Sequence, residues 1–231
     1  MRDPMWLRYL LGLHITAGAT AFVFAPLALA TRKGSKAHRR WGKIYFWAMA
    51  VVAASAIVMS AYRPILFLAL VAVFSFYAAF YAYRVLGMKD LGRGGKPGWV
   101  DWAAASITFV CSLMLALFGL VKPTMVQHMG IVSIVFGCIG MSLGAGRIYR
   151  FLRPPSDRMY WWYEHFQGMI ASYIAAWTAF SAVTLSRFIG PSFPIWIVWL
   201  WPTIVGVPAI ALTRRYYERK FASRRQSAVA D

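Results

Sequence analysis

The stretch WAAASITFVCSLMLALFGLV, residues 102–121, runs for 20 residues without a charged side chain. An α-helix needs about 20 mainly apolar residues to cross the hydrocarbon core of a bilayer. A soluble domain has about a quarter of its residues charged, whereas this chain of 231 residues is 60% hydrophobic and only 14% charged. The stretch therefore predicts a membrane-spanning helix, and the composition predicts an integral membrane protein.

Similar apolar stretches recur along the whole chain. Apolar residues lie all round each stretch, which is typical of helices inside a bilayer, whereas a β-barrel would show short alternating strands. We therefore predict an all-α, polytopic bundle of seven transmembrane helices. Residues 1–213 are expected to form one membrane domain, and residues 214–231 a basic tail. The predicted spans are Trp6–Ala30, Ile44–Tyr62, Ile65–Leu86, Val100–Val121, Met125–Ala145, Glu164–Ser186 and Phe193–Thr213.

The basic residues predict how the bundle is oriented. The chain has 25 Lys and Arg against 7 Asp and Glu. Cytoplasmic loops are enriched in Lys and Arg, so the basic connections and the tail are predicted to be cytoplasmic, with the N-terminus outside the cell. The expected location is the inner (plasma) membrane. The basic residues of these segments are Arg32, Lys33, Lys36, Arg39, Arg40 and Lys43; Arg84, Lys89, Arg93 and Lys96; Arg147, Arg150, Arg153 and Arg158; and Arg214, Arg215, Arg219, Lys220, Arg224 and Arg225.

The same charge distribution bears on partners. The formal net charge of +18 follows from this topology, so nucleic acid is not predicted as a partner. Anionic lipid headgroups at the cytoplasmic face are predicted instead. The sequence contains no recognisable nucleophile–base pair, nucleotide-binding loop or carboxylate dyad, and catalysis of the kind found in soluble enzymes is therefore not predicted.

Four histidines are the main candidates for chemistry, because ionisable residues inside a bilayer are costly. His14 lies about 12 Å from the outer end of the first span, at 1.5 Å per residue. His128 lies near the outer end of the fifth span. His38 and His165 lie at the cytoplasmic starts of the second and sixth helices. Histidines of two helices can hold a haem within a bundle, so we predict haem b at an outer pair and at an inner pair, with the histidines as iron ligands only.

The inner pair is expected to belong to a cytoplasmic polar cluster. Arg39, Tyr45 and Glu164 are the predicted neighbours of the two inner histidines. If the second and sixth helices face each other, the side chains of His38 and His165 should lie within about 8–13 Å. An interfacial histidine can also simply cap a helix or bond a carbonyl, and that alternative stays open.

Small residues accompany the histidines. Gly18 and Gly168 lie on the helix faces below His14 and His165. Such stripes leave room for a flat macrocycle, but they also let another helix approach closely, which is their commoner use in membranes. Gly137 belongs to a seven-residue glycine repeat on the face opposite His128, and this repeat predicts helix packing.

A longer pattern connects the first two helices. His14 and Gly18, followed by basic residues and then by His38-Arg39-x-x-Gly42-x-x-Tyr45, resemble the signature of a bacterial family of multi-pass membrane proteins, the domain of unknown function 2306 family. The resemblance covers the first 60 residues approximately. It implies a multi-pass membrane protein in which these matching positions matter. The family has no established activity to carry over.

Three functions are compatible with these patterns. The first is a haem b electron carrier that uses the two histidine pairs and works with a membrane redox partner. The second is a scaffold, assembly or lipid-binding protein without redox chemistry. The third is a facilitator or exporter of a small solute, for which Pro202 and Pro208 would kink the seventh helix. We take the haem protein as the leading hypothesis, because it is the most specific of the three.

Overall fold

A computed structural model of the chain describes residues 4–63, 65–121, 129–190 and 193–230. Every regular element within these ranges is helical, and seven of the helices are long and apolar enough to cross a membrane. The prediction of an all-α, multi-pass membrane protein is confirmed at this level. The elements are α1 (Met5–Ala30), α2 (Lys36–Tyr62), α3 (Leu66–Arg84), η1 (Val85–Gly87), η2 (Leu91–Arg93), α4 (Trp99–Val121), α5 (Met129–Leu152), α6 (Tyr160–Thr184), η3 (Leu185–Arg187) and α7 (Ile195–Ala230).

Three helices extend well beyond their predicted spans. Helix α2 begins at Lys36, within the basic segment, and α5 continues to Leu152. Helix α7 runs without a break from Ile195 to Ala230, so the predicted basic tail begins in the middle of a helix. The apolar part of a sequence marks the part that can lie in lipid, whereas Lys and Arg are good helix formers that let a helix continue past it.

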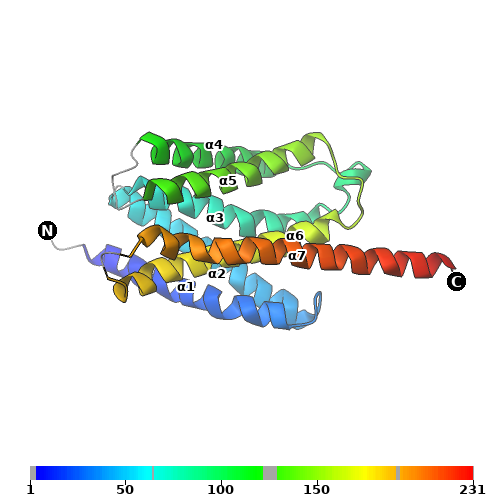
Figure 1. Cartoon of the computed structure of the whole chain (residues 1–231), viewed down its shortest axis with the longest axis horizontal. Helices are drawn as coiled ribbons and strands as arrows, with labels where there is room; N and C mark the ends of the chain where they lie inside the picture. The colour runs from blue at the N-terminus through cyan, green and yellow to red at the C-terminus, as the bar shows by residue number, and fades with distance from the viewer. Residues whose placement is uncertain (1–3, 64, 122–128, 191–192, 231) are drawn as a thin grey trace.

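The two ends of the bundle differ in their loops. Loops 31–35, 85–98 and 153–159 lie at the same end as the projecting C-terminal part of α7, and the start of α1 lies at the other end (Figure 1). We call the end with these three loops the basic end. Because the helix count is odd, the termini fall on opposite ends.

Helices α1, α2, α3 and α6 form a ring. Helix α2 packs against α1 and α3, and α6 packs against α3 and also contacts α1. Side chains from all four helices fill the centre of this ring, among them Ala21, Tyr45, Phe76 and Met169. The ring therefore has its own core, and α2 and α6 lie diagonally across it.

The other three helices cover α3 and α6. Helices α4 and α5 pair closely, both contact α3, and α7 packs along α6 and touches α5. The glycine repeat of α5 makes the α4–α5 contact: a Cβ on Gly137 would lie 2.6 Å from Ala116, and one on Gly144 would lie 3.0 Å from Ala105 O. The prediction that this repeat serves helix packing is confirmed.

Candidate functional site

His38 is fixed by the turn that starts α2. Gly34 adopts a left-handed backbone with a φ of 79°, which suits glycine. Ser35 then caps the helix, since its Oγ accepts the backbone N–H of His38 over 3.1 Å. The His38 ring reaches back to α1, where its Nδ1 lies 2.9 Å from Ala28 O. His38 is therefore held at both its backbone and its side chain.

His165 is held in the same manner by helix α3. It lies in the second turn of α6, and its Nδ1 is 2.8 Å from Ala82 O in the last turn of α3. The last carbonyls of a helix have no partner within that helix. Each histidine ring thus bonds a carbonyl near the C-terminus of an adjacent helix, and Ala28 O also accepts the hydroxyl of Thr31.

These bonds fix one nitrogen of each ring. A carbonyl oxygen can only accept, so Nδ1 of His38 and Nδ1 of His165 each carry a proton and donate it. Among the residues that the structure describes, neither Nε2 has a hydrogen-bond partner. In the neutral form of each ring, Nε2 therefore holds the lone pair that can bind a metal.

The two inner rings lie next to each other. Their centres are 6.2 Å apart, and their planes make an angle of 80°. This separation is smaller than the predicted range of about 8–13 Å. The predicted distances are too long, because two metal–nitrogen bonds of about 2.0 Å, plus about 1 Å from each Nε2 to its ring centre, span only about 6 Å.

A second polar contact joins the same two helices deeper in the ring. Tyr45 and Ser172 lie seven residues beyond His38 and His165, respectively, and their oxygens are 2.6 Å apart. Ser172 Oγ donates its proton to Met169 O over 2.8 Å, so it is Tyr45 that donates to Ser172. Both side chains are buried. The contact ties α2 to α6 across the ring interior.

The remaining two members of the predicted inner cluster lie elsewhere. Arg39 is exposed, and its Nη1 donates to Gly34 O over 2.6 Å. Glu164 is adjacent to His165 in sequence but points to another side of α6, where it pairs with Arg147 and Arg150 of α5. Successive residues of a helix point about 100° apart, which explains why Glu164 and His165 meet different helices.

The outer pair is described only in part. His14 lies on α1, with its Nδ1 2.9 Å from Ser55 Oγ of α2. Ser55 donates its own proton to Val51 O over 2.6 Å, so His14 is the donor in this bond, and in the neutral ring the lone pair is on Nε2. His128 lies outside the described residues, and its pairing with His14 stays a prediction.

The candidate glycines divide into two groups. A Cβ on Gly168 would lie 2.7 Å from the Cβ of Ala82, so α6 and α3 approach closely there. Gly137 makes the corresponding contact between α5 and α4. A Cβ on Gly42 would meet nothing within 4 Å, and one on Gly18 would be 4.0 Å from Val52. Close packing accounts for the first two glycines and does not account for the second two.

Sequence reasoning missed the partners of the acidic residues. Arg147 and Arg150 were assigned only to the positive face, although they share one side of α5 at a spacing of three residues. Asp101 is likewise buried, and it accepts Nε and Nη2 of Arg84, each over 2.9 Å. The few acidic residues could have indicated these pairs. A carboxylate in an apolar helix requires a countercharge, so each one predicts an Arg or Lys partner on a neighbouring helix.

The donor set of the site limits what it can bind. Within the described ranges, no three His, Cys, Asp or Glu side chains lie together as a metal-binding group. Two histidines are too few for a structural zinc site, which takes four protein ligands. Two axial histidines suffice for haem iron, because the macrocycle supplies the other ligands.

Comparisons with known proteins add no relative. No protein-family model matches the chain, no curated protein matches it, and no solved structure matches it. The resemblance to the domain of unknown function 2306 family therefore stays a prediction from the sequence.

Proposed function

We propose that the chain is a membrane-embedded haem b electron carrier whose inner haem is ligated by His38 and His165. The observation that carries the proposal is the pairing of these two rings across the four-helix ring, with 6.2 Å between their centres. This value agrees with the span of about 6 Å expected for two imidazoles that share one metal. This agreement supports His38 and His165 as the two ligands.

The hydrogen bonds of the two rings support the same assignment. A histidine that ligates a metal almost always donates its other ring N–H to a carbonyl, a carboxylate or water, which fixes the ring orientation. Ala28 O and Ala82 O take this role for His38 and His165. A role in helix capping alone would use Nδ1 and would not require the two rings to meet.

Haem b, when bound, supplies a one-electron couple at its iron. The chain contributes the two Nε2 ligands and a rigid frame behind them. Tyr45 and Ser172 close the ring interior two turns below the histidines, and their mutual hydrogen bond leaves neither oxygen as a competing ligand. The frame thus presents imidazole nitrogens as the available donors.

A second haem at His14 and His128 would extend the proposal to electron transfer across the membrane. His14 donates from Nδ1 as the inner histidines do, so its neutral ring would offer Nε2 as a ligand. In this proposal the basic end faces the cytoplasm of a cell with the protein in its inner membrane, and a membrane redox partner exchanges electrons with it. The positive-inside rule supports this orientation.

The visible spectrum of the detergent-purified protein tests the proposal. A bis-histidine haem b should give sharp α and β bands after dithionite reduction. His38→Ala and His165→Ala should each remove the inner haem, and His14→Ala and His128→Ala the outer one. Gln167→Ala is a matched control, because Gln167 lies two residues from His165 and its side chain bonds only within α6. A colourless, intact protein from haem-replete cells would refute the proposal.

A scaffold or assembly protein is the second candidate, and α7 favours it. This helix projects beyond the other six at the basic end (Figure 1). Arg214, Arg215 and Arg219 lie on the C-terminal part of α7, so a partner or anionic headgroups could bind there. Deletion of residues 214–231 should abolish complex formation if this is the function, and should leave a haem spectrum intact if the first proposal is correct.

A further inference from the structure

A buried group of charges lies between α5 and α6, separate from the histidine pair. The single carboxylate of Glu164 pairs with the guanidinium groups of both Arg147 and Arg150. The side chains of Glu164 and Arg147 are only 3% and 11% exposed. One positive charge of this group is therefore not balanced by a carboxylate. Arg147 is nearly enclosed, whereas the Arg150 side chain is 29% exposed.

Two tyrosines of α3 face the same region. Tyr77 and Tyr81 are 4% and 2% exposed, and both belong to the core cluster at the basic end. Among the described residues, neither hydroxyl has a hydrogen-bond partner, nor has Nε of Arg147. The Arg147 guanidinium lies over the Tyr81 ring, 4.3 Å from its centre. Three donors from α3 and α5 are therefore buried together without an acceptor. Oε2 of Glu164, which is ion-paired with Arg147, likewise has no hydrogen-bond partner among the described residues.

The nearby carboxylate of Asp101 does not balance the excess positive charge of Arg147 and Arg150. Asp101 accepts two bonds from Arg84 and one from the backbone N–H of Gly98, so its carboxylate is already used. The Tyr81 ring face offsets part of the Arg147 charge, since cation–π contacts contribute about 0.5–2 kcal/mol. An unbalanced buried charge costs more than this.

We propose that Tyr77, Tyr81 and Arg147 form a binding site for a small monovalent anion, such as a halide. An anion balances the excess charge, and it accepts from the two hydroxyls and from Nε of Arg147. A halide is small enough for a closely packed cluster, and it has no protons of its own to satisfy. The site is independent of the histidine pair, which lies on the opposite side of α3 and α6.

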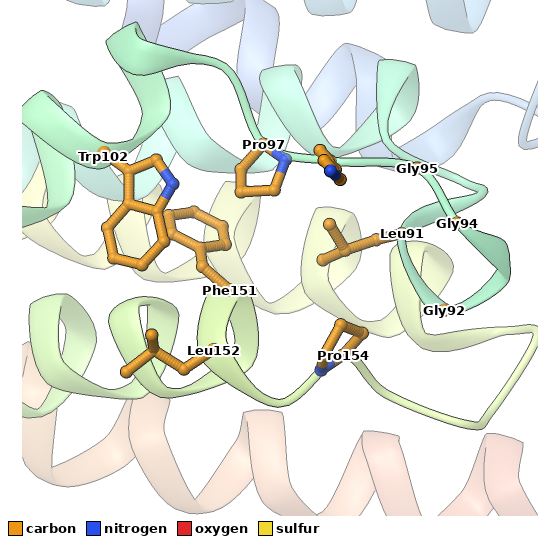
Figure 2. A pocket seen from close by; sticks show the side chains of 10 residues that line it. Leu91, Gly92, Gly94, Gly95, Pro97, Trp102, Phe151, Leu152 and Pro154 are labelled. Carbon is orange, nitrogen blue, oxygen red and sulfur yellow. The ribbon is translucent and has the colours of Figure 1, made fainter.

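A cavity lies beside this cluster at the basic end. It has a volume of about 440 Å³ and lies between the α3–α4 and α5–α6 loops, with Lys96 in its lining (Figure 2). Phe151 forms part of its wall, next to Trp102, and the ring centres of these two are 5.2 Å apart. On the other side, the Phe151 ring centre is 6.2 Å from that of Tyr81. Phe151 thus separates the cavity from the anion site.

Anion exchange at constant ionic strength tests the proposal. The full chain in detergent is brought from sodium gluconate into sodium chloride, and its melting temperature and its retention of ³⁶Cl⁻ in equilibrium dialysis are measured. We expect the melting temperature to rise with chloride and to saturate. Tyr77→Phe and Tyr81→Phe should each raise the half-saturating chloride concentration by about tenfold or more, because each removes a hydrogen bond to a charged ligand.

Tyr83→Phe is the matched control. Tyr83 lies on α3 as well, but its ring stacks on Phe46, away from the cluster. Its variant should bind chloride as the wild type does. Equal melting temperatures in gluconate and chloride, without retained ³⁶Cl⁻, would overturn the proposal. This result would mean that water is the hydrogen-bond partner of the two tyrosine hydroxyls. Wild-type chloride binding in both cluster variants would overturn it as well.

Discussion

The hydroxyl of Tyr45 donates to Ser172 Oγ over 2.6 Å, across the interior of the ring formed by α1, α2, α3 and α6. His38 and His165 lie seven residues earlier on the same two helices, and their ring centres are 6.2 Å apart. Two residue pairs at equal spacing therefore hold α2 and α6 in one register. This register is what makes a shared ligand for the two histidines chemically reasonable.

The Tyr45–Ser172 bond should respond asymmetrically to truncation. Tyr45→Phe removes one net hydrogen bond, worth about 1 kcal/mol, because Ser172 keeps its bond to Met169 O. Ser172→Ala should cost about 1–3 kcal/mol, because it leaves a buried hydroxyl without a partner. Unfolding in SDS measures both variants. The double variant should be about as stable as Tyr45→Phe alone, and additive losses would contradict the assigned direction of the bond.

Glu164→Gln should destabilise the bundle strongly. Removing the carboxylate charge leaves Arg147 and Arg150 without a countercharge in a buried region, and breaking a buried ion pair costs about 3–5 kcal/mol. The thermal unfolding midpoint in detergent gives the effect. Glu218→Gln is the control: Glu218 pairs with Arg214 on the exposed part of α7, where such a pair contributes about 0.3–0.5 kcal/mol. Equal effects of the two changes would refute the role of burial.

Two glycine-to-alanine substitutions should change the stability of the bundle in opposite directions. In Gly168→Ala the new Cβ would lie 2.7 Å from the Cβ of Ala82 and 2.8 Å from Ala78 O, so α6 and α3 must move apart. In Gly42→Ala the new Cβ meets nothing within 4 Å, and alanine gains about 0.5–1 kcal/mol over glycine inside a helix. Unfolding midpoints of the two purified variants compare them directly. Stabilisation by Gly168→Ala would contradict the close approach of the two helices.

The orientation of the bundle can be tested with reporter fusions. A reporter that is active only in the periplasm should work when it is fused after Arg63 or Arg187, and it should fail after Gly95 or at the C-terminus. These sites lie in loops at the two different ends of the bundle. A C-terminal fusion that is active in the periplasm would overturn the predicted orientation.

Selective loss of one haem should separate the two histidine pairs. His38→Ala should shift the reduced α band and halve the haem content, because it removes the inner haem. His14→Ala should also halve the haem content, because it removes the outer haem. The measurement is the pyridine haemochrome content together with the reduced-minus-oxidised spectrum. Loss of all haem in either variant would show a single shared site and would contradict the two-site arrangement.

Composition and local spacing are enough to predict the class of the protein and the number of its spans. Long stretches without charge can be stable only inside a membrane or a protein core, so composition is enough to predict seven apolar helices. The glycine repeat at Gly137 also predicted close packing, because a residue without a side chain lets two backbones approach. These properties depend on local spacing, which a single sequence displays directly.

Which polar side chains meet depends on how the helices pack, and local spacing does not show it. Glu164 and His165 are neighbours in the chain, yet one pairs with α5 and the other with α3 and α2, because successive helix residues point in different directions. Ser55 as the partner of His14, and Ser172 as the partner of Tyr45, were likewise not predictable. Each contact requires the rotation and the lateral order of the helices, and an apolar sequence with no charge pattern around its axis specifies neither.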